Sequence, residues 1–147
     1  MKCDVEIDHV LVIYILKMGV HEDTLVVLGD GQTVEAKFLR PGDNVRVKNG
    51  ASACIRRVIV TPCDNGTCDF VRAGRLMVTP NHKVYRNGAM VMPKGDVVRL
   101  QCKNVYSFSC VLGSYLRTPA IEAQGPSFFA IDTDFGEDAR GRRPMAG

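Results

Sequence analysis

Aromatic residues and net charge are both scarce in this sequence. Aromatic side chains make up 7% of the chain, and the formal net charge is only +3. A charge this small gives no electrostatic footprint for nucleic acid, and so few aromatic rings are expected to pack in the core rather than stack on bases. A Gly-rich phosphate loop, a His-Glu-x-x-His motif and a Gly-x-Ser-x-Gly motif are also missing. We therefore expect no nucleic-acid partner, no cofactor and no activity on an external substrate.

Long apolar runs are also lacking. The run at 10–16 is too short to cross a bilayer, which takes about 20 apolar residues. Asp4, Glu6 and Asp8 precede it, where a secretory signal carries positive charge, and no small-residue cleavage site follows. We predict that this run is a buried strand or the remnant of a longer upstream segment. The expectation is an intracellular chain with reduced thiols and no membrane span.

The six cysteines provide only one close pair, Cys63 and Cys68, on either side of Asp64-Asn65-Gly66. A structural zinc site takes four ligands, usually as two close pairs. The sequence therefore predicts a hairpin turn flanked by two thiols, and we expect no metal site. Zinc is the weaker alternative.

Short β-branched runs separated by turn residues fill the rest of the chain. Hydrophobic residues make up 46% of the sequence and charged residues 24%, which is typical of a globular domain. Asn-Gly recurs at 49–50, 65–66 and 87–88, and it supplies the positive φ pair that tight hairpins require. This pattern predicts an all-β sandwich or barrel-like domain. The expected strands lie at 24–28, 33–38, 44–48, 54–60, 75–79, 83–86, 90–92, 96–101 and 104–112.

Two segments share one pattern, Gly-Asp-x-Val-Arg followed by an apolar residue. They are PGDNVRV at 41–47 and KGDVVRL at 94–100. Each follows a hairpin-like turn, at Asp30-Gly31 and Asn87-Gly88 respectively. We interpret them as copies of a duplicated hairpin unit. The alternative is convergent turn sequence, because Gly-Asp before a strand is common.

The landmarks also follow a specific order along the chain. Asp23-Thr24 begins a strand, and FLRPGDNVRV, MVTPNHKVYRNG, MVMPKGD and VYSFSCVL come after it. This order resembles the Hint superfamily, the fold shared by inteins and hedgehog autoprocessing domains, and within it the Vint branch found beside von Willebrand A-type modules. The likeness covers roughly residues 19–112, and more loosely the stretch to Gly136. It implies an all-β, Hint-type horseshoe of antiparallel β-hairpins with pseudo-two-fold duplication.

The resemblance divides the chain into three parts. Residues 1–18 would be an N-terminal extension or upstream remnant, and 19–136 the Hint/Vint-like domain. The basic segment 137–147 is expected to be a flexible, solvated tail. The implied partner is the upstream polypeptide, which serves in cis as self-substrate, and we expect a monomer.

The implied chemistry is self-cleavage by an N-to-S or N-to-O acyl shift, and the resemblance gives Thr79 and His82 the catalytic roles. Thr79 can hydrogen-bond the peptide before the nucleophile, and His82 can protonate the departing nitrogen. With a near-neutral intrinsic pKa, His82 can then switch from acid to base. Asp23 and Thr24 are expected to support the nucleophile's strand.

The nucleophile position departs from the family pattern. Family members carry Cys or Ser four residues before the Asp of Asp-Thr, and here that position is Gly19. Glycine has no side chain and cannot attack a carbonyl. Asp132-Thr-Asp134, within FFAIDTDFG, stands where a family Gly-His would fall, and the His-Asn pair used in splicing is absent from the chain's end.

Three hypotheses follow. The chain could still self-cleave with another group, for which His21 is the nearest candidate. It could be a degenerate, catalytically inactive Hint fold kept as a binding or structural module, which Gly19 favours. It could also be a small β-barrel binding protein unrelated to Hint, which leaves the ordered landmarks unexplained. Under the second hypothesis, Thr79 is a strand-end hydroxyl that satisfies a turn and His82 is a partly exposed histidine. If these two side chains do not converge on the Gly19 backbone, there is no remnant site.

Overall fold

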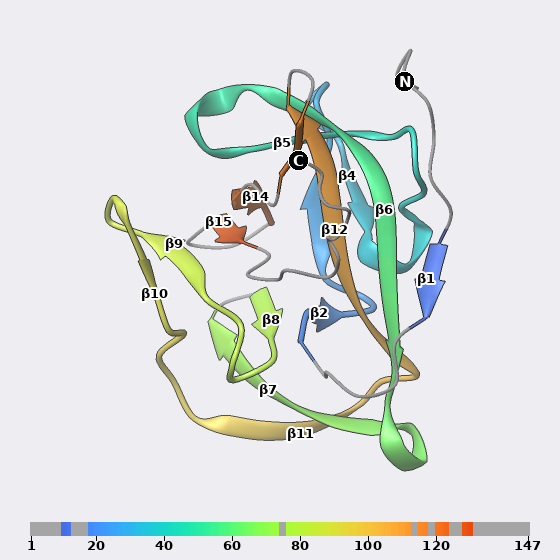
Figure 1. The fold of residues 1–147 in the computed structure, drawn as a ribbon. Coiled ribbons are helices and arrows are strands. Elements are labelled where there is room, and N and C mark those ends of the chain that lie inside the picture. The colour runs from blue at the N-terminus through green and yellow to red at the C-terminus, as the bar shows by residue number, and fades with distance from the viewer. Residues whose placement is uncertain are drawn as a thin grey trace.

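A computed structural model describes residues 10–12, 18–73, 76–112, 115–117, 120–123 and 128–130 (Figure 1). Its regular elements are strands and three short 3-10 helices, η1 Ala36–Phe38, η2 Lys48–Gly50 and η3 Asp64–Gly66. The all-β prediction is confirmed. The strands are β1 Val10–Val12, β2 Val20–His21, β3 Leu25–Val27, β4 Thr33–Glu35, β5 Asn44–Arg46, β6 Ser52–Pro62, β7 Thr67–Ala73, β8 Leu76–Val78, β9 Val84–Arg86, β10 Ala89–Val91, β11 Val97–Gln101, β12 Asn104–Leu112, β13 Tyr115–Arg117, β14 Ala120–Glu122 and β15 Phe128–Ala130.

The largest sheet has the order β1-β6-β12-β2-β8-β7-β11, with β5 also on β6 and β13 also on β12. A second sheet has the order β10-β9-β15-β14, and β3 pairs with β4 in a third. The pairs are antiparallel except β1 with β6. In Figure 1 the ribbon curves from β6 through β7 and β11 to the projecting β9–β10 hairpin, which gives the molecule its horseshoe outline.

The strand order repeats along the chain. In the first unit, β2 to β6, a short strand precedes the β3–β4 hairpin, a Gly-Asp strand (β5) and a long strand (β6). In the second unit, β8 to β12, a short strand (β8) likewise precedes the β9–β10 hairpin, a Gly-Asp strand (β11) and a long strand (β12). Equivalent strands meet, because β2 pairs with β8 and β6 pairs with β12. The pairing of the two units fits the predicted duplication.

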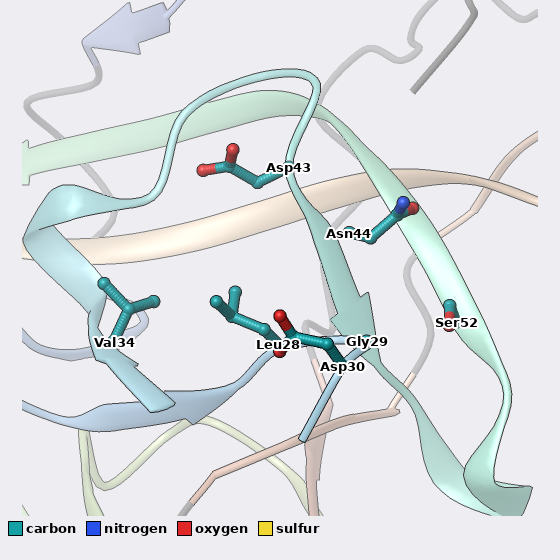
Figure 2. Close-up of a pocket in the computed structure, with 7 residues that line it drawn as sticks. All are labelled: Leu28, Gly29, Asp30, Val34, Asp43, Asn44 and Ser52. Atoms are coloured by element: carbon teal, nitrogen blue, oxygen red, sulfur yellow. The ribbon is translucent and has the colours of Figure 1, made fainter. Parts of the chain in front are cut away.

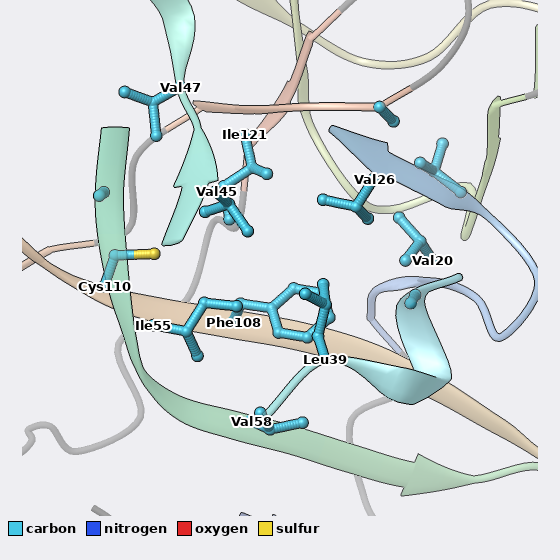
Figure 3. Packing of buried hydrophobic residues seen from close by; sticks show 14 of the residues in the cluster. Val20, Val26, Leu39, Val45, Val47, Ile55, Val58, Phe108, Cys110 and Ile121 are labelled. Carbon is cyan, nitrogen blue, oxygen red and sulfur yellow. The ribbon is translucent and has the colours of Figure 1, made fainter. Parts of the chain in front are cut away.

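The main core lies between the two units and β14 (Figure 3). Burial alternates along β5 and β8, as in a strand with one buried face, whereas β6 has consecutive buried residues. Each fully buried Val, Ile or Phe side chain contributes about 1.5–3 kcal/mol. A smaller cluster at the other end of the sheet contains Phe70, Cys102 and Val105. The labelled residues of the main core are Val20, Val26, Leu39, Val45, Val47, Ile55, Val58, Phe108, Cys110 and Ile121.

The Asn-Gly turns have different outcomes. Asn87 and Gly88 both have positive φ (51° and 83°) and join β9 to β10 as a hairpin, as predicted. Asn65 and Gly66 also have positive φ (54° and 72°), but the hairpin predicted there is wrong. β6 pairs with β12 and β7 with β11, so η3 is a corner where the chain leaves one partner for another.

The N-terminal run contains β1, which runs parallel to the end of β6. The remainder of 1–18 before Met18, and the tail 137–147, lie outside the described residues. The three-part division of the chain stays a prediction. Among the residues that the structure describes, no helix has the length and apolar character needed to span a membrane.

Candidate functional site

The VTPNH segment forms a tight corner at the end of β8. The His82 backbone N–H donates to the Thr79 carbonyl at 3.0 Å, with Pro80 and Asn81 between them. This i to i+3 bond defines a β-turn, for which Pro is favoured at the second position. Thr79 and His82 are both buried, whereas Asn81 is exposed. The turn therefore points its two chemically useful side chains into the protein.

The turn changes how Thr79 pairs with Gly19. The Thr79 N–H donates to the Gly19 carbonyl at 2.9 Å, as in an antiparallel ladder. The Thr79 carbonyl, however, already accepts the turn bond from His82. The Gly19 N–H donates instead to the Thr79 hydroxyl oxygen, Oγ1, at 3.1 Å. A hydroxyl thus occupies a place that a carbonyl fills in an ordinary ladder, and a hydroxyl can donate as well as accept.

Ser107 holds the other end of the same peptide unit. Its hydroxyl, fully buried on β12, donates to the Met18 carbonyl oxygen at 2.7 Å. The Met18–Gly19 peptide is therefore bound on both sides, through its carbonyl by Ser107 and through its N–H by Thr79. A donor on the carbonyl oxygen polarises the bond toward nucleophilic attack and stabilises charge on that oxygen. Sequence reasoning missed Ser107, although VYSFSCVL was one of its landmarks.

The His82 ring is fully buried at the same corner, so the partly exposed histidine expected for an inactive fold is wrong. Its Nδ1 lies 2.9 Å from the Lys83 carbonyl oxygen. Since a carbonyl only accepts, Nδ1 is assigned as the donor, and Nε2 of the neutral ring is then the proton-accepting nitrogen. The ring orientation is thereby fixed by the backbone beside it. The acid–base role of His82 stays a prediction.

Gly19 occupies a conformation that leaves no room for a side chain. Its φ is +156°, and a Cβ added there would lie 2.4 Å from the Tyr106 carbonyl oxygen. The same Cβ would lie 2.9 Å from the Ser107 hydroxyl. Because the nearest atom is backbone in a paired strand, a larger residue requires β2 and β12 to move apart. Position 19 therefore lacks both a nucleophile and the space for one in this conformation.

A family model described as "Vint: Hint-domain" matches residues 19–134. The match covers most of the chain and begins at Gly19. The chain belongs to the Vint-type Hint-domain family. A search of curated proteins finds no match. The predicted resemblance is confirmed, and this Hint domain has the all-β fold that it implied.

The two residues predicted to support the nucleophile's strand, Asp23 and Thr24, have different surroundings in the Hint domain. Thr24 is fully buried, and its hydroxyl donates to the Met77 carbonyl of β8 over 3.4 Å. It therefore contacts the strand that leads into Thr79. The Asp23 side chain instead forms an ion pair with Lys37 at 2.8 Å, and this hydrogen bond raises the pKa of Lys37. Asp23 thus ties β2 to η1, on a surface that is partly exposed.

His21 is held as a structural residue in the Hint domain. Its Nε2 donates to the Gln101 carbonyl at 2.7 Å, and its Nδ1 accepts the Asp23 N–H at 3.0 Å. The ring also meets Phe70 edge-on at a centroid distance of 5.1 Å. With one nitrogen donating and the other accepting, no lone pair is left to attack a carbonyl. His21 is therefore a poor substitute for the missing nucleophile.

The Hint domain carries a hollow of about 240 Å³ lined by residues of the first unit (Figure 2). Asp30 and Asp43 line it, but each carboxylate serves a local turn. Asp30 accepts the Gln32 N–H at 3.0 Å, and Asp43 accepts the Arg40 N–H at 2.8 Å. Across the described part of the chain, no group of three or more His, Cys, Asp or Glu side chains is placed to hold a metal ion.

A second, open groove of about 500 Å³ borders the VTPNH corner. Thr79, Cys68 and Arg99 are among the residues that line it. The segment Asp132–Asp134, where the family Gly-His would fall, lies outside the described residues. The candidate site therefore consists of the Met18–Gly19 peptide, Thr79, His82 and Ser107.

Proposed function

We propose that this chain is a cleavage-defective Hint autoprocessing domain, which holds its upstream junction at Met18–Gly19 without cutting it. One observation carries this proposal. The peptide unit is bound at its carbonyl by Ser107 and at its N–H by Thr79, yet residue 19 has no nucleophilic atom. The upstream polypeptide is then a covalently attached ligand in cis.

The reaction of an intact site defines what is lost. A sulfur or oxygen on residue 19 would attack the Met18 carbonyl carbon, and the residue 19 nitrogen would leave with an added proton. The product is a thioester or ester that a thiol or water can cleave. Ser107 would stabilise charge on the carbonyl oxygen, and Thr79 and His82 would deliver the proton to the leaving nitrogen. The first step, and therefore every step after it, depends on a side chain that Gly19 does not have.

The remaining contacts support a structural role for the site. The Gly19 N–H and the Thr79 N–H are each bonded across the strand pair, and Val20 pairs with Val78 below them. On β2's other edge, Val20 pairs with Tyr106 of β12. Gly19 and Val20 are thus held between β8 and β12, together with the Met18 carbonyl that precedes them.

A fusion experiment tests the proposal directly. A passenger protein is fused before residue 1 of the full chain and incubated for days with a thiol such as dithiothreitol. We expect the fusion to stay intact on gels and in intact mass spectra. A thiol-dependent product ending at Met18 would overturn the proposal.

Substitution of Gly19 tests whether more than the nucleophile has been lost. Gly19→Cys supplies a thiol, and Gly19→Ala is the matched control for the added Cβ. Since that Cβ meets the Tyr106 carbonyl, we expect both variants to be destabilised alike and Gly19→Cys to remain uncut. Thiol-dependent cleavage of Gly19→Cys that disappears on adding His82→Ala would instead show that only the nucleophile is missing.

A further inference from the structure

Three cysteines separated in sequence meet at the end of the molecule opposite the main core. Cys63 follows β6, Cys68 lies in β7, and Cys102 follows β11. Cys102 is part of the small cluster with Phe70 and Val105, and Cys63 and Cys68 pack against it. All three thiols are free, whereas Cys54 is disulfide-bonded, which differs from the expectation of reduced thiols throughout.

The backbone holds these thiols together. The Cys63 N–H donates to the Lys103 carbonyl at 2.9 Å, and the Cys102 N–H donates to the Gly66 carbonyl at 2.9 Å. The turn after β6 and the turn after β11 are therefore bonded in both directions. Cys68 pairs with Leu100, two residues before Cys102, so the period of a strand places Cys68 and Cys102 on one face.

The side chains are also in contact. Burial raises the pKa of the Cys63 thiol, and the neighbouring Cys102 and Cys68 sulfurs, to which it donates hydrogen bonds, raise it further. Burial likewise raises the pKa of Cys102 to about 11. The Cys102 sulfur donates in addition to the Asn104 carbonyl at 3.0 Å. The Cys63 and Cys102 thiols are thus packed against each other in a small apolar cluster.

We propose that Cys63 and Cys102 form a reversible disulfide that locks the turn after β6 to the turn after β11. A disulfide needs Cα atoms within about 7 Å, and the two backbone bonds between these turns and the packing of Cys63 against the cluster of Cys102 keep the two cysteines next to each other. Cys63 and Cys102 lie beside those bonds, whereas Cys68 is displaced along β7 and lines the open groove.

The oxidant is a low-molecular-weight disulfide such as oxidised glutathione. The Cys63 thiolate attacks one of its sulfurs, a mixed disulfide forms, and one glutathione thiolate leaves. The Cys102 thiolate then attacks the Cys63 sulfur, and the second glutathione leaves. The two protons lost by the cysteines pass to the two glutathione thiolates, and the two electrons lost by the protein reduce the oxidant.

The crosslink would act on the strand that carries the candidate site. The turn after β11 holds β2, because Glu22 Oε1 accepts the N–H groups of Lys103 at 3.0 Å and Asn104 at 3.2 Å. The Gln101 carbonyl, at the start of the same turn, accepts a hydrogen bond from His21 Nε2. The disulfide would therefore rigidify the segment just after Gly19. This effect on the site rests on the proposed function, but the crosslink itself does not.

Peptide mapping of the wild-type full chain decides the pairing without any variant. The protein is equilibrated with oxidised glutathione, alkylated, digested without reduction and analysed by mass spectrometry. We expect a Cys63–Cys102 linked peptide, with Cys110 unmodified because it is fully buried. Its rate of formation should rise about tenfold per pH unit below the thiol pKa values, because the thiolate reacts. A Cys63–Cys68 link, glutathione adducts alone or no reaction would each overturn the proposal.

Two further measurements separate the crosslink from its effect. Cys68→Ser, the matched control, should keep the linked peptide, and Cys102→Ser should lose it. Loss of the link in Cys68→Ser would contradict the pairing. Hydrogen exchange of residues 20–24 should slow several-fold on oxidation, and equal exchange in both forms would overturn the effect on β2. The passenger fusion is also examined in both redox forms. If it stays intact in both, the result for the disulfide does not depend on the proposed absence of cleavage.

Discussion

The two Gly-Asp strands have nearly the same sequence but opposite surroundings. In β5, Val45 is fully buried in the main core, where it meets Leu28 across an isolated bridge. Its equivalent in β11, Val98, is only partly buried, and the adjacent Val97 is 56% exposed. Val47, directly after β5, bridges to Ile121 in the middle of β14, whereas β11 is the last strand in its sheet order. The shared pattern therefore specifies a turn and a strand, and the neighbouring elements decide the burial.

Truncation of the equivalent residues Val45 and Val98 should give the largest difference in the free energy of unfolding. Val45→Ala removes methyl groups from a fully buried site, and we expect a loss of about 2–3 kcal/mol in the free energy of unfolding. Val98→Ala should cost below about 1 kcal/mol. Chemical denaturation of both variants checks this, and equal losses would mean that β11 is covered by something beyond the described residues.

Removal of the Thr79 hydroxyl should destabilise the protein more than removal of the Thr24 hydroxyl, and this is the second largest expected contrast between the two units. Thr79→Val leaves the buried Gly19 N–H without its acceptor, which costs about 1–3 kcal/mol. Thr24→Val, in the first unit, removes only a long 3.4 Å bond and should cost below about 1 kcal/mol. Thermal or chemical unfolding measures both. A Thr24 variant that is the less stable of the two would contradict the importance given to the Gly19 bond.

Alkaline pH should destabilise the protein through thiols of the second unit. The pKa of Cys102 is raised from 9.0 to about 11, so the folded state binds more protons than the unfolded state between these values. Its contribution is complete below about pH 9 and is lost as the pH rises toward 11, by about 1 kcal/mol at pH 10. Cys54, in the first unit, is disulfide-bonded and does not titrate. Unfolding of Cys102→Ala should show a shallower decline between pH 8 and 10, and an unchanged slope would contradict this assignment.

The equivalent arginines should show the smallest effects. Arg99 pairs with Asp69 at 3.0 Å but is 70% exposed, and Arg46 pairs with Glu122 at 3.8 Å. Exposed pairs of this kind contribute about 0–1 kcal/mol, so Arg99→Ala and Arg46→Ala should each change the unfolding free energy by less than about 1 kcal/mol. Repeating the measurement in high salt should reduce both effects further. A larger loss for Arg46→Ala would show that its half-buried stem packs on the core.

The sequence predicted the parts of the fold that depend on local residues. Asn87-Gly88 forms a hairpin because a tight turn between two consecutive, paired strands needs two residues with positive φ, and Asn-Gly adopts them readily. The same reasoning failed at Asn65-Gly66, since the partners of β6 and β7 are distant strands that no local pattern shows. For the site, the order of the landmarks led to Thr79 and Gly19, which the structure joins by a hydrogen bond.

Ser107 and the steric limits at Gly19 could not be read in the same way. A serine on a strand is ordinary, and its meaning comes from the Met18 carbonyl that lies opposite it in space. The meeting of Cys102 with Cys63 likewise follows from strand pairing rather than from spacing. The catalytic roles of Thr79 and His82 stay predictions, because a hydrogen bond at rest does not establish a proton transfer.

The close approach of Gly19 to the Tyr106 carbonyl also bears on what a substitution can achieve. Because β2 and β12 pack around a residue with no Cβ, a side chain at position 19 and the space for it cannot come from one substitution. Two changes are needed, one to reopen the backbone and one to supply the nucleophile. Under the proposed function, repair of the site is therefore an engineering problem of the backbone before it is one of chemistry.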